Sequence, residues 1–142
     1  MVEHPRAATL QRAIEIFISP NDDSIANLVQ LVTDDVTVWT PNMLAVGLSD
    51  LQENLAFRES AFSDVDIQFD TLDVFGSRGL AEFRVEGIFS GPFVIEEAVV
   101  IEPNHHNLLL GAAAVADFEQ TKIKAVRAYF DDSSHLEQML AT

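Results

Sequence analysis

Three charged side chains share one face of a predicted strand in the middle of the chain. Glu82, Arg84 and Glu86 alternate with apolar residues, and side chains two apart on a strand lie about 6–7 Å apart on the same face. An arginine between two carboxylates can orient a water or a polar ligand group, and the carboxylate can move a proton. The same alternation also describes an exposed row of charges on the outer side of a core strand. From the residues alone, it favours this simpler interpretation. The apolar residues of the core face would be Ala81, Phe83, Val85 and Phe89.

The four histidines offer little for metal binding or nucleophilic catalysis. His105 and His106 are neighbours in a polar segment, and adjacent side chains on extended backbone point apart, which makes a poor chelate. His4 is near the N-terminus and His135 is on a predicted helix, and neither has an evident serine or aspartate partner. The chain has no cysteine, which excludes thiolate chemistry and Cys-ligated zinc. We therefore expect no metal and no cofactor.

Composition limits the partners of the protein. The 142 residues suit one domain over residues 1–142, and 48% apolar residues suit a packed core. Lys and Arg number 8 against 23 Asp and Glu, a net charge of −15 without any basic cluster, so nucleic acid and anionic membranes are poor partners. No apolar segment resembles a signal peptide or a membrane span, which predicts a cytoplasmic protein.

The pattern of elements predicts helices first and a sheet afterwards. We expect helices from Pro5 to Ser19, from Asn21 to Val32, from a capping box at Ser49–Gln52, and after caps at Asp131 and Asp132. Strands are expected over 35–40, 65–74 with a bulge, 80–89, 108–118 and 123–130. Because the strands do not alternate with helices, the fold class is α+β with an antiparallel sheet.

This order of elements and four short strings resemble the nuclear transport factor two-like superfamily. The strings are Trp39-Thr-Pro-Asn-Met43, Phe83-Arg-Val-Glu-Gly87, Ser90-Gly-Pro-Phe93 and Arg127-Ala-Tyr-Phe-Asp131. Within the superfamily, the chain looks like the SnoaL-like polyketide cyclases and limonene epoxide hydrolase. The resemblance covers nearly the whole chain and implies a curved antiparallel sheet wrapped around the N-terminal helices, a cone-shaped, cystatin-like α+β roll that encloses a pocket. It is weak for activity, because the superfamily holds enzymes, binding proteins and transport adaptors.

The resemblance implies a catalytic set of Glu86, Arg84 and Asn42. Arg84-Val85-Glu86 is similar to the Arg-x-Asp of limonene epoxide hydrolase, with Glu in place of Asp. Glu86 would be the acid/base and Arg84 its orienting partner. Asn42 matches the asparagine that helps to hold the water in that enzyme, although turn chemistry beside Pro41 explains this residue equally well.

The same resemblance also predicts the pocket wall and two missing acid/base groups. Ala128 stands at the position of the hydrolase's general-base aspartate, and Phe89 stands where many SnoaL-like proteins have histidine. Neither side chain can exchange a proton. The residues expected to line the pocket are Trp39, Thr40, Ala128 and Phe130.

Three functions remain open from the sequence. The first is an acid/base enzyme of the cyclase, isomerase or hydrolase type that acts on a small apolar substrate. The second is a non-catalytic protein that binds a small apolar ligand, and the third is a protein-interaction adaptor. If Arg84 and Glu86 face the pocket, Phe83 and Val85 form an apolar outer face, which predicts a homodimer.

Overall fold

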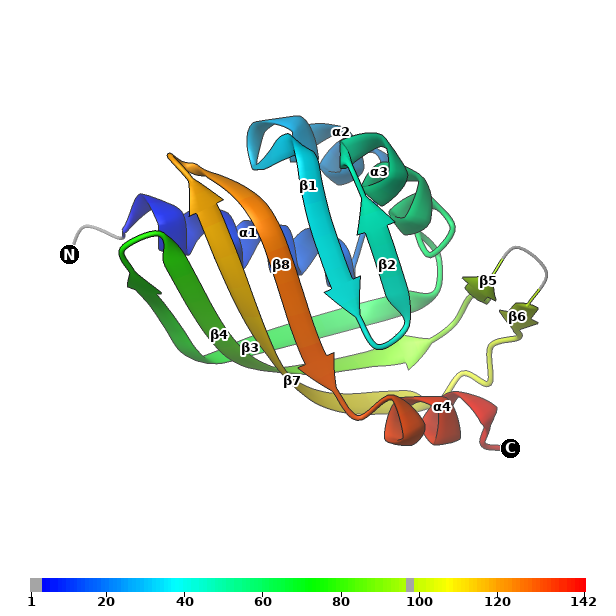
Figure 1. Cartoon of the computed structure of the whole chain (residues 1–142). Helices are drawn as coiled ribbons and strands as arrows, with labels where there is room; N and C mark the ends of the chain where they lie inside the picture. The colour runs from blue at the N-terminus through cyan, green and yellow to red at the C-terminus, as the bar shows by residue number, and fades with distance from the viewer. Residues whose placement is uncertain (1–3, 97–98) are drawn as a thin grey trace.

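A computed structural model describes residues 4–96 and 99–142 and shows an α+β architecture (Figure 1). The helices are α1 (Pro5–Ile18), α2 (Asp22–Asn27), the short 3₁₀ helix η1 (Leu28–Gln30), α3 (Leu48–Ala56) and α4 (Asp132–Leu140). The strands are β1 (Val32–Thr40), β2 (Met43–Val46), β3 (Phe62–Phe75), β4 (Arg78–Phe89), β5 (Phe93–Glu96), β6 (Val99–Ile101), β7 (Asn107–Glu119) and β8 (Lys122–Phe130). The predicted fold class is confirmed.

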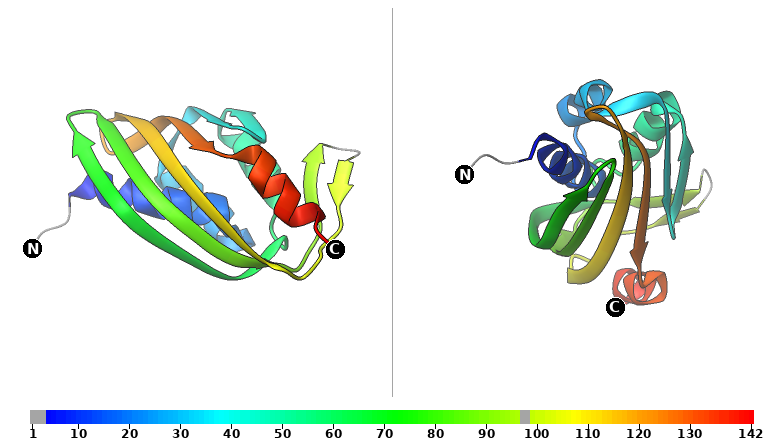
Figure 2. Two further views of the ribbon diagram at one scale, coloured as in Figure 1. Left: turned by 90° about the horizontal axis from the view of Figure 1, so that it is seen from below. Right: turned by 60° about the vertical axis from the view of Figure 1, so that its left-hand side comes forward.

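The main sheet has six strands in the order β2-β1-β8-β7-β4-β3, and it curves around α1 (Figure 2). Strand β3 pairs with β4, β4 with β7, and β7 with β8, and all three pairs are antiparallel. The sheet departs from the predicted antiparallel pairing at one place, where β1 pairs with β8 in parallel, with Val38 opposite Val126. No hairpin joins these two strands, so their direction is not fixed by a turn. A separate ribbon of β5 and β6 lies beside one end of the sheet.

The first helices follow their local sequence with two corrections. Pro5 occupies the first turn of α1, and His4 Nδ1 caps that helix by accepting from the Arg6 N–H. The predicted second helix ends early, because Val32 is fully buried in β1 opposite Ile123. The expected capping box at Ser49–Gln52 is also wrong, since α3 begins after Gly47 and has no side-chain cap.

After β4 the backbone passes very close to Ser60 at Gly91. A Cβ atom there would lie 1.9 Å from the carbonyl oxygen of Ser60, so only glycine fits. This approach carries the chain from β4 into β5 and places Phe93, which is 3% exposed, in a small core cluster with Phe89 and Met139. Phe93 and Leu108 of this cluster line a hollow inside the curved sheet.

None of the described helices is long and apolar enough to cross a membrane.

Candidate functional site

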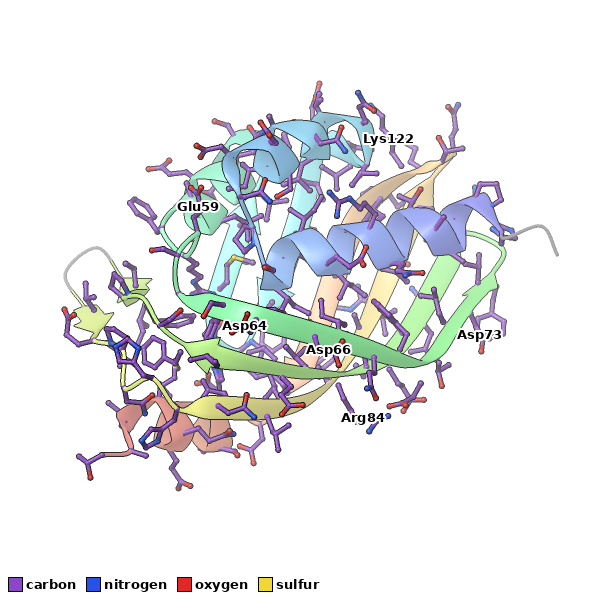
Figure 3. All side chains as sticks on the ribbon, turned by 180° about the vertical axis from the view of Figure 1, so that it is seen from behind. Glu59, Asp64, Asp66, Asp73, Arg84 and Lys122 are labelled. Carbon is purple, nitrogen blue, oxygen red and sulfur yellow. The ribbon has the colours of Figure 1, made fainter. Side chains whose placement is uncertain are left out.

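The charged face of β4 lies outside the hollow. Phe83 and Val85 point inward, while Arg84 and Glu86 are exposed. Arg84 forms two hydrogen bonds of 3.0 Å with Asp70, and Figure 3 shows it projecting from the side of the sheet away from α1. Glu86 accepts a 2.6 Å hydrogen bond from the side-chain amide of the exposed Asn107.

The assignment of Glu86 and Arg84 to the pocket is therefore wrong. Shifting a strand by one residue exchanges its two faces, and burial of Phe83 and Val85 determines which face turns inward here. The expectation that Trp39 lines the pocket is also wrong. Trp39 is 42% exposed and contacts Tyr129 on the outer face, with ring centroids 5.5 Å apart.

The hollow contains a mainly apolar pocket of about 140 Å³. Of the residues expected to line the pocket, Thr40, Ala128 and Phe130 lie on its wall. Asn42, from the expected catalytic set, lies there too. The remaining wall is formed mostly by aliphatic and aromatic side chains from α1, β3, β4, β5 and β7. Four of the lining residues carry polar side chains, and these are Thr40, Asn42, Arg58 and His135.

Arg58 is the cation of this pocket and follows directly after α3. Its Nη1 donates to Asn42 Oδ1 at 3.0 Å, and its Nη2 donates to the main-chain oxygen of Asn42 at 2.6 Å. The guanidinium also stacks on Phe93, 4.5 Å from the ring centroid. Burial lowers the pKa of Arg58 to about 10, and the charge of Asp132 partly opposes this effect. Arg58 is thus positively charged at neutral pH.

Asn42 lies both in a turn and on the pocket wall. It lies in the turn between β1 and β2, where its main-chain N–H donates to Thr40 Oγ1 at 3.3 Å. Thr40 Oγ1 in turn donates to Asn42 Oδ1 at 3.1 Å, the same atom that accepts from Arg58. Since Oδ1 is the acceptor in both bonds, the amide nitrogen of Asn42 is available as a donor beside the pocket.

His135 is the titratable group that the sequence analysis missed. It lies in the first turn of α4, is 7% exposed, and packs among Phe62, Phe93 and Phe130 with ring centroids 5.8–6.1 Å away. Its Nδ1 is buried and has no hydrogen-bond partner among the described residues. Burial lowers the pKa of His135; the charge of Asp132 raises it and that of Arg58 lowers it further. The imidazole is neutral at pH 7.

The spacing Asp132-x-x-His135 was the available signal for this group, because residues three apart lie on one face of a helix. The sequence predicts helix caps at both Asp131 and Asp132. Only Asp131 is the N-cap, and its side chain accepts from the Ser134 N–H at 3.1 Å. Asp132 Oδ1 is buried without a hydrogen-bond partner among the described residues. Asp132 therefore acts on His135 through its charge.

His105 and His106 are exposed, and within residues 4–96 and 99–142 no group of three or more His, Asp or Glu side chains is placed to hold an ion.

The sequence matches the model of the SnoaL-like polyketide cyclase family over residues 8–139. The chain belongs to this family. It is a small-molecule pocket protein with a nuclear transport factor two-like fold. No curated protein matches the sequence.

Solved structures agree on the fold at low sequence identity. A putative SnoaL-like polyketide cyclase from Jannaschia sp. CCS1 has a TM-score of 0.82 at 14% identity, covering 97% of this chain and 93% of that one. IdmH, a putative polyketide cyclase from Streptomyces antibioticus, has a TM-score of 0.72 at 14% identity, covering 96% and 99%. An LEH-like epoxide hydrolase from M. tuberculosis has a TM-score of 0.68 at 11% identity, covering 96% and 90%.

Proposed function

We propose that this protein is an acid/base enzyme of the cyclase, isomerase or hydrolase type, which acts on a small apolar substrate and uses His135 to move a proton. The observation that carries the proposal is a buried, neutral histidine at the polar end of an apolar pocket that also contains a half-buried cation. A neutral imidazole is a competent base near pH 7. The chemistry is assigned to His135 in place of Glu86.

The three polar groups support a division of roles. His135 takes a proton from a carbon beside a substrate carbonyl, and the electron pair moves onto the carbonyl oxygen. Arg58 and the amide of Asn42 stabilise the negative charge on that oxygen. The charge of Asp132 favours the imidazolium that His135 becomes. Return of the proton to another atom completes an isomerisation, and attack of the enolate carbon on a second carbonyl closes a ring.

A non-catalytic binding protein is the second candidate, and Ala128 favours it. Ala128 lies on the pocket wall and Phe89 is fully buried in the core, so neither position supplies the acid/base group that the family resemblance leads one to expect. In that case Arg58 and Asn42 hold a ligand that His135 does not change.

Deuterium exchange separates the two candidates. Phenylacetone is a small ketone with acidic C–H groups beside its carbonyl, and NMR in D₂O follows their exchange. If the protein is an enzyme, the wild type should exchange these protons faster than buffer alone does. His135→Gln should lose this acceleration, and the exposed control His106→Gln should keep it. Equal rates for the wild type and His135→Gln would favour binding alone. Mass spectrometry of ligand retained after native purification would identify the natural molecule.

We further propose that the protein forms a homodimer, through other residues than the sequence suggested. Phe83 and Val85 line the pocket, so they cannot form the outer apolar face that motivated the prediction. The outer face instead carries an apolar patch on three adjacent strands, β2, β1 and β8. The patch consists of Trp39, Leu44, Val46 and Tyr129, which are between 42% and 64% exposed. A second copy of the chain would remove this patch from water.

A further inference from the structure

The size of the pocket limits the ligand to a small molecule. An apolar cavity of about 150 Å³ accepts a molecule of benzene's size, whereas pockets for drug-sized ligands measure about 300–1,000 Å³. The pocket here has about 140 Å³. Aromatic and aliphatic side chains form most of its wall, including Phe83 and Leu110. One ring or a short chain fills such a space, and a fused polycyclic molecule exceeds it.

Arg58 gives this small pocket a positive end. Among the residues described, no carboxylate lines the pocket, and Arg58 forms no salt bridge. Asp132 acts on the guanidinium through its charge, and Asp50 and Glu53 line a separate outer hollow that Arg58 also borders. Within residues 4–95 and 99–142, the negative groups near Arg58 therefore lie outside the pocket wall. A half-buried positive charge that forms no salt bridge with these residues favours binding of an anion from the pocket side.

The hydrogen bonds of Arg58 leave suitable donors for that anion. Nη1 and Nη2 each use one N–H on Asn42, and each has a second N–H. The planar guanidinium matches a planar carboxylate in geometry and charge. The free amide donor of Asn42 adds a neutral hydrogen bond at the same end of the pocket.

We propose that the pocket selects monocyclic or short-chain apolar carboxylic acids, bound as the carboxylate on Arg58 with the apolar part among the aromatic side chains. This inference rests on the proposed small-molecule pocket and names its ligand class. A carboxylate on Arg58 takes the donors that would otherwise hold an enolate oxygen, so the ligand class belongs with the binding candidate. It does not follow from net charge, because the chain as a whole is acidic. It follows from Arg58, which is the charged side chain on the described pocket wall.

Calorimetric titration with matched ligands tests the selection on the unmodified protein. The probes are 4-ethylbenzoate and 4-ethylbenzamide, which share shape and differ in charge, and anthracene-2-carboxylate, which keeps the carboxylate on a larger frame. We expect 4-ethylbenzoate to bind at least about tenfold more tightly than the amide, since hydrogen bonds to charged groups are the stronger ones. We expect anthracene-2-carboxylate to bind more weakly than 4-ethylbenzoate.

Two variants locate the effect. Arg58→Met should reduce the affinity for the acid to that for the amide, and Arg84→Met on the outer face should leave both unchanged. Equal affinity of the wild type for acid and amide would overturn the inference and leave the small-molecule pocket intact. Absence of binding by all three probes would count against the pocket function as well. Tighter binding of anthracene-2-carboxylate would overturn the size limit.

Discussion

Arg58 is fastened to Asn42 by two hydrogen bonds, one to the side chain and one to the main chain, across 16 residues of sequence. The pair joins the end of α3 to the turn between β1 and β2. These two bonds and the stacking on Phe93 hold the guanidinium in one position on the pocket wall. Asn42 is thus a positioning residue for Arg58, whatever the ligand.

This pairing predicts different effects for two substitutions of Asn42. Asn42→Ala leaves a buried N–H of Arg58 without its acceptor, which should lower the free energy of unfolding by about 1–3 kcal/mol. Asn42→Asp supplies a carboxylate partner for Arg58, so it should retain stability and weaken 4-ethylbenzoate binding by competing for the cation. Urea unfolding and calorimetric titration measure the two effects. Gln68→Ala, on the exposed face of β3, is the control, and an Asn42→Ala midpoint equal to that of the wild type would contradict the assignment.

Substitution of Glu86 on the outer face of β4 should have little effect on stability. Arg84 and Glu86 are exposed, and ion pairs and hydrogen bonds between exposed side chains contribute little. Glu86→Ala should therefore unfold at nearly the wild-type urea midpoint, and phenylacetone exchange should be unchanged. Glu82→Ala, on the same face, is the matched comparison. Strong destabilisation or loss of exchange in Glu86→Ala alone would return Glu86 to the candidate site.

Long periodic elements could be predicted from the sequence, and short ones could not. The alternation in 65–74 and 80–89 and the helical spacing after Pro5 extend over several turns or pleats, so the strands β3 and β4 and the helix α1 were recognised. Strand β2 has 4 residues, and β5 and β6 have 4 and 3. Such segments are too short to show a period. The parallel pairing of β1 with β8 also depends on packing between distant segments.

The site was predicted less well than the fold, and β4 shows why. Its alternation favoured burial of Phe83 and Val85, which the structure confirms, while the family resemblance reversed that assignment. Arg58 follows α3, and His135 lies in α4. Only tertiary packing brings these two residues to one pocket. One local signal was present, the Asp132-x-x-His135 spacing.

The proposed homodimer predicts that one charge on the outer patch separates the subunits. Leu44 is 64% exposed, so Leu44→Glu should fold as the wild type does and place like charges opposite each other across a twofold interface. Light scattering should give a dimer for the wild type and a monomer for this variant at micromolar concentration. Phe75→Glu is the control, because Phe75 is also 64% exposed but lies at the end of β3, outside the patch. A monomeric wild type would reject the proposal.

His135 predicts a specific dependence of stability on pH. Its pKa is lowered in the folded protein by burial, whereas the unfolded chain has a histidine pKa of about 6.5. Between these two values the unfolded state binds more protons than the folded one, so stability is lost as the pH falls below about 6.5. One such group contributes a slope of at most about 1.4 kcal/mol per pH unit.

Urea unfolding between pH 8 and pH 5.5 measures this contribution by difference. His135→Gln removes the titrating group, so its stability should fall less steeply than that of the wild type as the pH decreases. His106→Gln, on an exposed position, should follow the wild type. The same protonation consumes the proposed base, so the rate of phenylacetone exchange should be constant above pH 6.5 and should decrease only as the pH passes through the lowered pKa of His135. Identical pH slopes for the wild type and His135→Gln, or an NMR titration of His135 at or above pH 6.5, would show that this imidazole is not the buried neutral base on which the proposed function depends.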